Sequence, residues 1–218
     1  MQPDSTPFKP LMSLHQVQVA IKDGTRIGPI DWVLSRRERV QTLCATPAQW
    51  MLLNDLLCGI HPPVSGSLQE GSPLVINSDR IIWERMDINR GINDLLETGT
   101  LPPHIWLDSG KINLWVLLDR LGLEPHLRRI PLRHAPALIR ERYWVFRFLV
   151  SESDLMMGGE IFAVSDPVSR ALLAQRWNHW PGTLLAGCIR EHLPGPVQQL
   201  ARIDDQGLFT LSPLPVPA

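Results

Sequence analysis

The sequence predicts a protein of the α/β class. Two observations indicate this class: apolar and polar residues alternate near the N-terminus as in half-buried strands, and strand-like and helix-like segments alternate from residue 155 onward. Between these regions, residues 87–150 have mostly helical spacing, typical of a helical subdomain. We therefore expect a single domain at 11–211, with loose tails at 1–10 and 212–218.

The composition narrows the classes of function. The chain has 218 residues, of which 44% are hydrophobic and 20% charged, as in a folded globular domain. Its formal net charge of −1 excludes nucleic-acid binding driven by global charge. The sequence has no run of about 18 apolar residues that would predict a membrane span, and the polar start does not resemble a secretory signal. Three widely spaced cysteines, Cys44, Cys58 and Cys188, favour a reduced compartment, so we expect a cytoplasmic protein.

In the first half, a hairpin is expected to precede a strand and a helix. Residues 14–21 and 30–34 alternate in polarity on either side of the turn Asp23-Gly24. A short strand at 40–43 leads into an apolar helical stretch at 50–60. Further short strands are expected near 67–69, 74–76 and 80–83.

In the second half of the sequence, we expect two helices followed by alternating strands and helices. Helical spacing at 112–121, closed by Gly122, and again at 137–150 indicates the two helices. The elements that follow are a strand at 155–157, a helix at 168–177, a strand at 183–188, a helix at 196–200, and strands at 202–204 and 207–211.

Three stretches, in this order, resemble the ATPase subunits of ATP-binding cassette (ABC) transporters, over about residues 12–211. Residues 38–68 resemble the strand, phosphate loop and helix of that family, including the ending Leu56 to Pro62. Residues 153–173 resemble the strand that ends in Asp-Glu and the turn after it, and residues 183–207 resemble the closing strands. The resemblance implies a phosphate-loop NTPase-like sheet with an antiparallel β arm and a short helical insert.

The residues that hold phosphate in that family are replaced here. Counting back from Gly59 places the phosphate loop GxxxxGK[ST] on residues 44–51, which contain no glycine. Pro47 lacks an N–H group, Trp50 stands at the lysine position, and Met51 stands at the position of the magnesium-binding hydroxyl. We therefore expect a degenerate phosphate loop.

Other family motifs also differ. Gly159 takes the position of the magnesium-supporting Asp, whereas Glu160 keeps the position of the catalytic Glu and Asp166 that of the turn Asp. The first four positions of the LSGGQ signature fall on residues 135–138, and the switch histidine falls on Ile189. We interpret Glu160 and Asp166 as vestigial, and predict no catalytic, cofactor-binding or metal-binding residue, no cofactor, and no enzyme activity.

An arginine-rich region and two tryptophans are candidate contacts with a partner. Six arginines between 128 and 147 are accompanied by one acidic residue, Glu141. Arginine pairs with carboxylates and phosphates, and both arginine and tryptophan often anchor protein interfaces. The candidate contacts are Arg128, Arg129, Arg133, Arg140, Arg142, Arg147, Trp177 and Trp180.

The function predicted from these residues is that of a pseudo-ATPase: a scaffold or regulatory subunit that binds other proteins of a bacterial membrane-associated transport, secretion or envelope-assembly complex. It would be cytoplasmic or peripheral at the inner membrane, as a homo- or hetero-oligomer. Two alternatives remain open. One is a divergent ATPase subunit of an ABC transporter with unusual nucleotide ligands, and the other is a nucleic-acid-binding regulator that uses the Arg128–Arg147 region.

Overall fold

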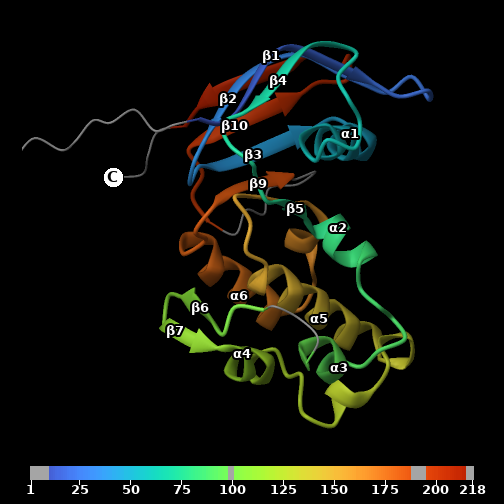
Figure 1. Cartoon of the computed structure of the whole chain (residues 1–218), viewed down its shortest axis with the longest axis vertical. Coiled ribbons are helices and arrows are strands. Elements are labelled where there is room, and N and C mark those ends of the chain that lie inside the picture. The colour runs from blue at the N-terminus through green and yellow to red at the C-terminus, as the bar shows by residue number, and fades with distance from the viewer. Residues whose placement is uncertain (1–9, 98–100, 188–194, 215–218) are drawn as a thin grey trace, which may run out of the picture.

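A computed structural model describes residues 10–97, 101–187 and 195–214. Its strands form a central sheet, an antiparallel arm and a separate two-stranded hairpin, and most of its helices lie at the opposite end of the molecule from the arm (Figure 1). This is the mixed α/β class that the polarity pattern predicts. Among the described residues, no helix has the length and apolarity needed to cross a membrane.

The central sheet has six strands in the order β11-β10-β3-β9-β8-β5. Five of them run parallel, and β11 is antiparallel to β10. Because β3, β9 and β8 run parallel, their carboxyl ends lie at the same edge of the sheet. The strands are β3 (Arg39–Cys44), β5 (Ile76–Ser78), β8 (Leu155–Gly158), β9 (Thr183–Gly187), β10 (Gln199–Ile203) and β11 (Phe209–Pro213).

The antiparallel arm has the order β2-β1-β4, with bounds Arg26–Ser35, Pro10–Ala20 and Ser65–Glu70. Alternate residues of β2 are buried, as the polarity pattern predicts. Helix α1 (Pro47–Leu57) contributes Leu52, Leu53, Leu56 and Leu57 to the core cluster that the arm and the central sheet share. This packing holds the first turn of α1 at the carboxyl edge of the sheet.

The remaining elements pack on a second core cluster. Helix α5 (Ala137–Val150) has the bounds that its spacing predicts, and it buries Tyr143 and Phe146. The other elements in this part of the chain are α2 (Asp79–Glu84), α3 (Ile92–Glu97), β6 (His104–Leu107), β7 (Gly110–Asn113), α4 (Leu114–Arg120), η1 (Leu127–Arg129), η2 (Leu132–His134), η3 (Glu160–Ala163) and α6 (Pro167–Asn178).

Three predicted elements are wrong in type. The segment expected as a strand at 80–83 is helix α2, because the side chain of Ser78 caps it by accepting from Ile81 N–H. The mostly helical stretch contains the hairpin β6-β7, which turns at Gly110 with a φ of +100°. The helix expected at 196–200 does not form: residues 196–198 belong to no helix or strand, and β10 begins at Gln199, because it pairs with β3 and β11; β10 also includes the first two residues of the strand predicted at 202–204. In each case a cap or a strand partner overrides the local pattern.

Candidate functional site

The connection between β3 and α1 stands where the resemblance places a phosphate loop. Only Ala45 and Thr46 separate the last residue of β3 from Pro47, the first residue of α1. Thr46 and Gln49 form a capping box: Thr46 Oγ1 accepts from Gln49 N–H, and Gln49 Oε1 accepts from Thr46 N–H, both at 3.2 Å. The strand therefore passes directly into a capped helix.

The backbone donors of this connection are directed into the protein itself. Ala45 N–H donates to Ile203 O at 3.0 Å, and Trp50 N–H is 3.4 Å from Thr46 O. Pro47 has no N–H. The Gln49 amide donates to Asp204 O at 2.7 Å, which fastens the first turn to the end of β10. A phosphate cradle needs several free backbone N–H groups converging on one point, and these residues use theirs internally.

Trp50 fills the space between α1 and the ends of two sheet strands. A Cβ atom built on Gly159, which follows β8, would lie 2.4 Å from Trp50 Nε1. One built on Gly187, the last residue of β9, would lie 2.2 Å from Trp50 Cε2. Both glycines are therefore required by the indole, since any side chain would collide with it. The sequence revealed the exchange of Asp for Gly159 but not its link to Trp50.

Asp79 is a buried carboxylate at this edge that the sequence analysis missed. It is 4% exposed, and its Oδ2 accepts from Gly159 N–H at 2.8 Å and Ile161 N–H at 3.0 Å, so it ties α2 to the end of β8. Burial raises the pKa of Asp79, and the backbone hydrogen bonds oppose that shift only in part. Its signal in the sequence was the pair Ser78-Asp79, which is typical of a helix start rather than a strand.

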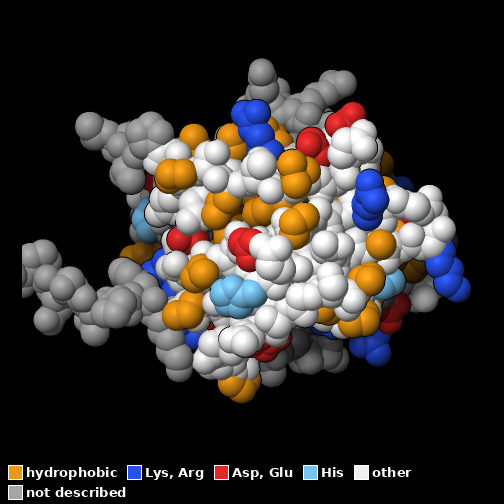
Figure 2. Space-filling view, turned by 90° about the horizontal axis from the view of Figure 1, so that it is seen from above, with side chains coloured by type: hydrophobic (Ala, Val, Ile, Leu, Met, Phe, Trp, Pro, Cys, Tyr) orange, Lys and Arg blue, Asp and Glu red, His pale blue; other side chains and the backbone are white. Residues whose placement is uncertain are grey.

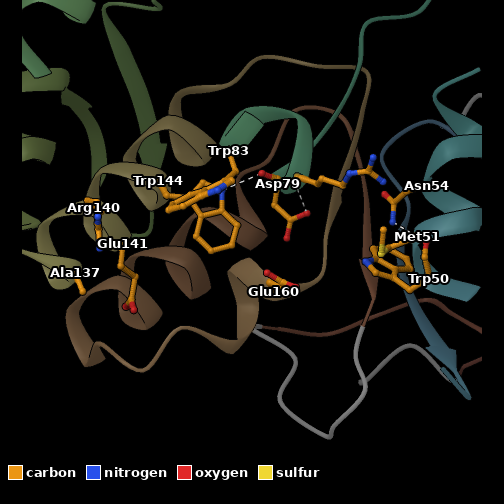
Figure 3. A pocket seen from close by; sticks show the side chains of 11 residues that line it. Trp50, Met51, Asn54, Asp79, Trp83, Ala137, Arg140, Glu141, Trp144 and Glu160 are labelled. Atoms are coloured by element: carbon orange, nitrogen blue, oxygen red, sulfur yellow. Dashed lines mark hydrogen bonds between the residues drawn. The ribbon is translucent and has the colours of Figure 1, made fainter. Parts of the chain in front are cut away.

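A cavity of about 540 Å³ opens beside these residues, between α1, α2, α5 and η3 (Figure 3). The indoles of Trp83 and Trp144 meet edge to face in it, with centroids 5.3 Å apart, and Trp144 Nε1 donates to Asp79 O at 2.9 Å. Glu160, at the start of η3, is exposed and lines the cavity. The lining residues are Trp50, Met51, Asn54, Asp79, Arg80, Trp83, Ala137, Arg140, Glu141, Trp144 and Glu160.

Asp166 forms a structural pair with Arg142 and is not one of the residues that line the cavity. It caps α6 by accepting from Ser169 N–H at 3.0 Å, and Arg142 of α5 reaches both its oxygens at 3.0 and 3.1 Å. Burial works to raise the pKa of Asp166, but the hydrogen bonds from Arg142 and Ser169 outweigh burial and lower it. The pair joins α5 to α6, so the structure does not bring Asp166 and Glu160 into one site.

Three predicted partner contacts lie in the interior. Trp177 and Trp180 are 2% and 3% exposed and pack on Phe162 and Phe148. Arg128 is 5% exposed: its guanidinium donates to Leu123 O and pairs with Asp119. These side chains are therefore part of the fold, and their assignment as surface contacts is corrected. Trp177 and Trp180 lie beside polar residues in the sequence, and this pattern does not show that the segment packs back onto the core.

The other candidate arginines do not form one basic stripe. Arg142 is engaged by Asp166, and Arg133 donates to Asn89 and His134 at 2.9 and 3.0 Å. Arg129 is exposed, whereas Arg140 and Arg147 are half-buried. Seen from the end that carries the β arm, Lys and Arg side chains are also scattered (Figure 2). The exposed large side chains that the sequence did not single out include Trp83, Trp106 and Trp115.

The described residues contain no group of three His, Cys, Asp or Glu side chains that could hold a metal ion. Burial raises the pKa of Cys44 to about 12 and, with Asp55, that of Cys58 to about 11. Both thiols therefore stay protonated near neutral pH and are poor nucleophiles. Cys188 and Ile189, the predicted switch position, lie outside the described residues.

Comparison with known proteins identifies the fold. No family model matches the chain, and the search of curated proteins finds no significant match. Among solved structures, CbiO1 of Clostridium perfringens, part of the CbiONQ ABC transporter complex, superposes with a TM-score of 0.64 at 16% identity, over 93% of this chain and 87% of that one. A bacterial Atm1-family ABC exporter with ATP bound gives a TM-score of 0.68 at 12% identity, over 92% of this chain but 38% of the exporter chain.

These matches contradict the prediction that the chain is not an enzyme. The solved structures that it resembles are ABC transporter proteins, one of them with ATP bound, and this resemblance points to an enzyme-like fold. Missing side chains in a motif do not remove the chain from that class of fold. The strand order, the β arm and the superposition lead to one conclusion: this chain has the fold of the ATPase subunits of ABC transporters.

Proposed function

We propose that the chain is a scaffold or regulatory subunit of a membrane-associated transport, secretion or envelope-assembly complex, and that it acts by binding other proteins of that complex. The observation that carries this proposal is the indole of Trp50 packed against Gly159 and Gly187. By the resemblance, Trp50 stands at the position of the phosphate-loop lysine, which reaches the outer phosphates of a nucleotide. A preserved fold with this place filled is suited to binding macromolecules.

The balance of interactions at the β3–α1 connection supports the same proposal. A triphosphate needs a cradle of N–H groups, a lysine and a magnesium ion. Here the donors of Ala45, Thr46 and Gln49 are used within the protein. The positive end of the α1 dipole remains, but it contributes only about 0.3–1 kcal/mol per anion contact. That contribution is small beside the interactions of a lysine and a metal ion with a phosphate.

The similar solved structures support the proposal that the chain belongs to a membrane-associated complex. CbiO1 is part of an ABC transporter complex, and it matches nearly the whole of this chain. By analogy, we place this chain on the cytoplasmic side of such a complex, peripheral to the inner membrane. Exposed tryptophans, of which Trp106 and Trp115 are 55% exposed, are the side chains that most often anchor protein interfaces.

A divergent ATPase is the second candidate, and one observation favours it. Glu160 lines a cavity in which Arg80 and Arg140 could meet phosphate oxygens. The nucleic-acid-binding alternative is less favoured, because Arg128 and Arg142 of its basic region are engaged by Asp119 and Asp166. It also predicts binding that weakens steeply between about 50 and 200 mM salt, which a gel-shift series measures.

The proposal is tested by two measurements on the full chain. Affinity purification from the native host, followed by mass spectrometry, is expected to recover subunits of one membrane-associated complex, whether or not Mg-ATP is present. Titration with fluorescent Mg-ATP and a phosphate-release assay then examine the second candidate. Micromolar binding that changes in Trp50→Ala, or turnover that falls in Glu160→Gln, would support the divergent ATPase and overturn the scaffold proposal.

A further inference from the structure

We propose that the cavity between α1, α2, α5 and η3 receives an arginine side chain presented by a partner protein. This inference rests on the proposed function, and it specifies the chemistry of the partner. The cavity volume of about 540 Å³ lies within the range of small-ligand sites and exceeds what one guanidinium and its stem require.

The aromatic wall of the cavity fits a cation. Trp83 is 45% exposed although it is a large apolar residue, and its ring meets Trp144 edge to face at 5.3 Å and 72°. The indole of Trp144 is held by its hydrogen bond to Asp79 O. The face of an indole attracts a guanidinium through its quadrupole, and arginine also stacks on it through its planar group. A partner arginine would therefore cover surface that is now partly in water.

The polar wall of the cavity offers acceptors. Asn54 is 6% exposed and its Nδ2 donates to Trp50 O at 2.9 Å, which settles the orientation of the amide. Its Oδ1 is buried and has no hydrogen-bond partner within the part of the chain that the structure describes. A buried acceptor of this kind is stabilised by a hydrogen-bond donor, and the guanidinium carries five N–H donors that could supply one. Glu160 supplies a carboxylate on the same cavity (Figure 3).

The charges around the cavity also favour a cation. Its lining includes the carboxyl groups of Asp79, Glu141 and Glu160 and the guanidinium groups of Arg80 and Arg140. The positive charge of Arg80 is compensated by carboxylates beyond the lining, since Arg80 pairs with Asp55 at 3.1 Å and with Glu84 at 2.9 Å. Without Asp79, whose neutral form burial favours, the lining has the carboxyl groups of Glu141 and Glu160 against the one remaining guanidinium, that of Arg140, so a phosphate entering here would meet both glutamates.

The direct test is a titration of the full chain with N-acetyl-arginine amide, followed by heteronuclear NMR. We expect saturable shifts at the indole N–H of Trp83 or Trp144, and binding at least about tenfold weaker in Trp83→Ala and Glu160→Gln, because each removes one recognition element. The matched controls are Trp115→Ala and Glu124→Gln, exposed residues outside the cavity lining. N-acetyl-leucine amide is expected not to saturate. Thermal unfolding establishes that each variant is folded.

Four outcomes decide the inference. It is overturned if N-acetyl-arginine amide does not saturate, if the cavity variants bind it as the controls do, or if Mg-ATP competes for the cavity. In the native complex, Trp83→Ala and Glu160→Gln are expected to lower the recovered partner while Trp115→Ala does not. A complex that survives both cavity variants refutes this inference and leaves the proposed function standing, whereas failure to recover any complex with the wild-type chain refutes the proposed function itself.

Discussion

The indole of Trp50 occupies the space that a side chain at Gly187 would need, since a Cβ atom on Gly187 would lie 2.2 Å from Cε2 of the ring. Two residues far apart in the chain are thus one packing unit at the carboxyl edge of the sheet. Gly159 belongs to the same unit, with a Cβ-to-Nε1 distance of 2.4 Å. Any change at one of these positions is therefore expected to depend on the others.

Gly187→Ala is expected to destabilise the protein by about 1–3 kcal/mol, because the added methyl group overpacks the indole. The measurement is a double-mutant cycle with Trp50→Ala in urea unfolding. With the indole removed, the alanine at 187 is expected to cost much less, giving a coupling energy of about 0.5–3 kcal/mol. Additive effects of the two substitutions would contradict the packing relationship.

Thr46→Ala is expected to lower the free energy of unfolding by about 1 kcal/mol, because it removes the side-chain acceptor of the capping box of α1. Thr25→Ala is the matched control: Thr25 donates to Asp23 through its backbone N–H, which alanine retains. Denaturant unfolding of both variants provides the comparison. Equal stability of the two would show that α1 does not depend on this cap.

The carboxyl group of Asp166 makes stability depend on acid pH. Its pKa is lowered in the folded protein, so the folded state favours the carboxylate. Asp166 therefore stabilises the fold above the unfolded pKa of about 3.9, and this stability is lost as pH falls through the folded-state pKa. In urea unfolding at a series of pH values, Asp166→Asn is expected to flatten the acid limb. An unchanged slope in this variant would refute the assignment.

The pH dependence of stability that we expect from Asp79 has the opposite sign to that from Asp166. Burial raises its pKa, so its contribution to stability is fully present below about pH 3.9 and is lost as pH rises through the folded-state pKa. Asp79→Asn is expected to remove that decline, which the same pH series measures. A matched control is Asp87→Asn, because Asp87 is exposed. If the free energy of unfolding declines with pH in Asp79→Asn as it does in the wild type, another group causes the decline.

Trp177→Ala is expected to cost about 3–5 kcal/mol, because it empties a buried site and removes the hydrogen bond from Nε1 to Pro196 O. Trp106→Ala, at a position 55% exposed, is expected to change stability by less than about 1 kcal/mol. Thermal and denaturant unfolding compare the two. A small effect at Trp177 would return that residue to the list of surface contacts.

The strongest local patterns predicted their elements well. The spacing of apolar residues predicted the bounds of α5, and the alternation of apolar and polar residues predicted the hairpin of β1 and β2. Both patterns are informative because helical and extended backbones place neighbouring side chains on defined faces. Short segments without such a pattern were misassigned. The strand predicted at 202–204 overlaps β10, but the helix expected at 196–200 is wrong: β10 begins at Gln199 because β3 and β11 supply its hydrogen bonds, and no local pattern records those partners.

Some features of the candidate site could likewise be predicted from the sequence, whereas others could not. Pro47 and Trp50 were visible in the sequence as residues that a phosphate loop would not contain, since the reason is local: one lacks an N–H and the other lacks a charge. Trp177, Trp180 and Arg128 were placed on the surface by their residue type. The structure buries them, because burial depends on which segments fold over a side chain.

The sequence by itself determined the α/β class, the order of its principal elements and the loss of glycine and lysine from the phosphate-loop position. Only the tertiary structure decided that the indole of Trp50 fills the space beside Gly159 and Gly187, and that Asp79, Asn54 and the Trp83–Trp144 pair line one cavity with Glu160. The physical reason is that sheet order brings the ends of distant strands together, and this order arises from hydrogen bonds and packing between segments that no local periodicity records.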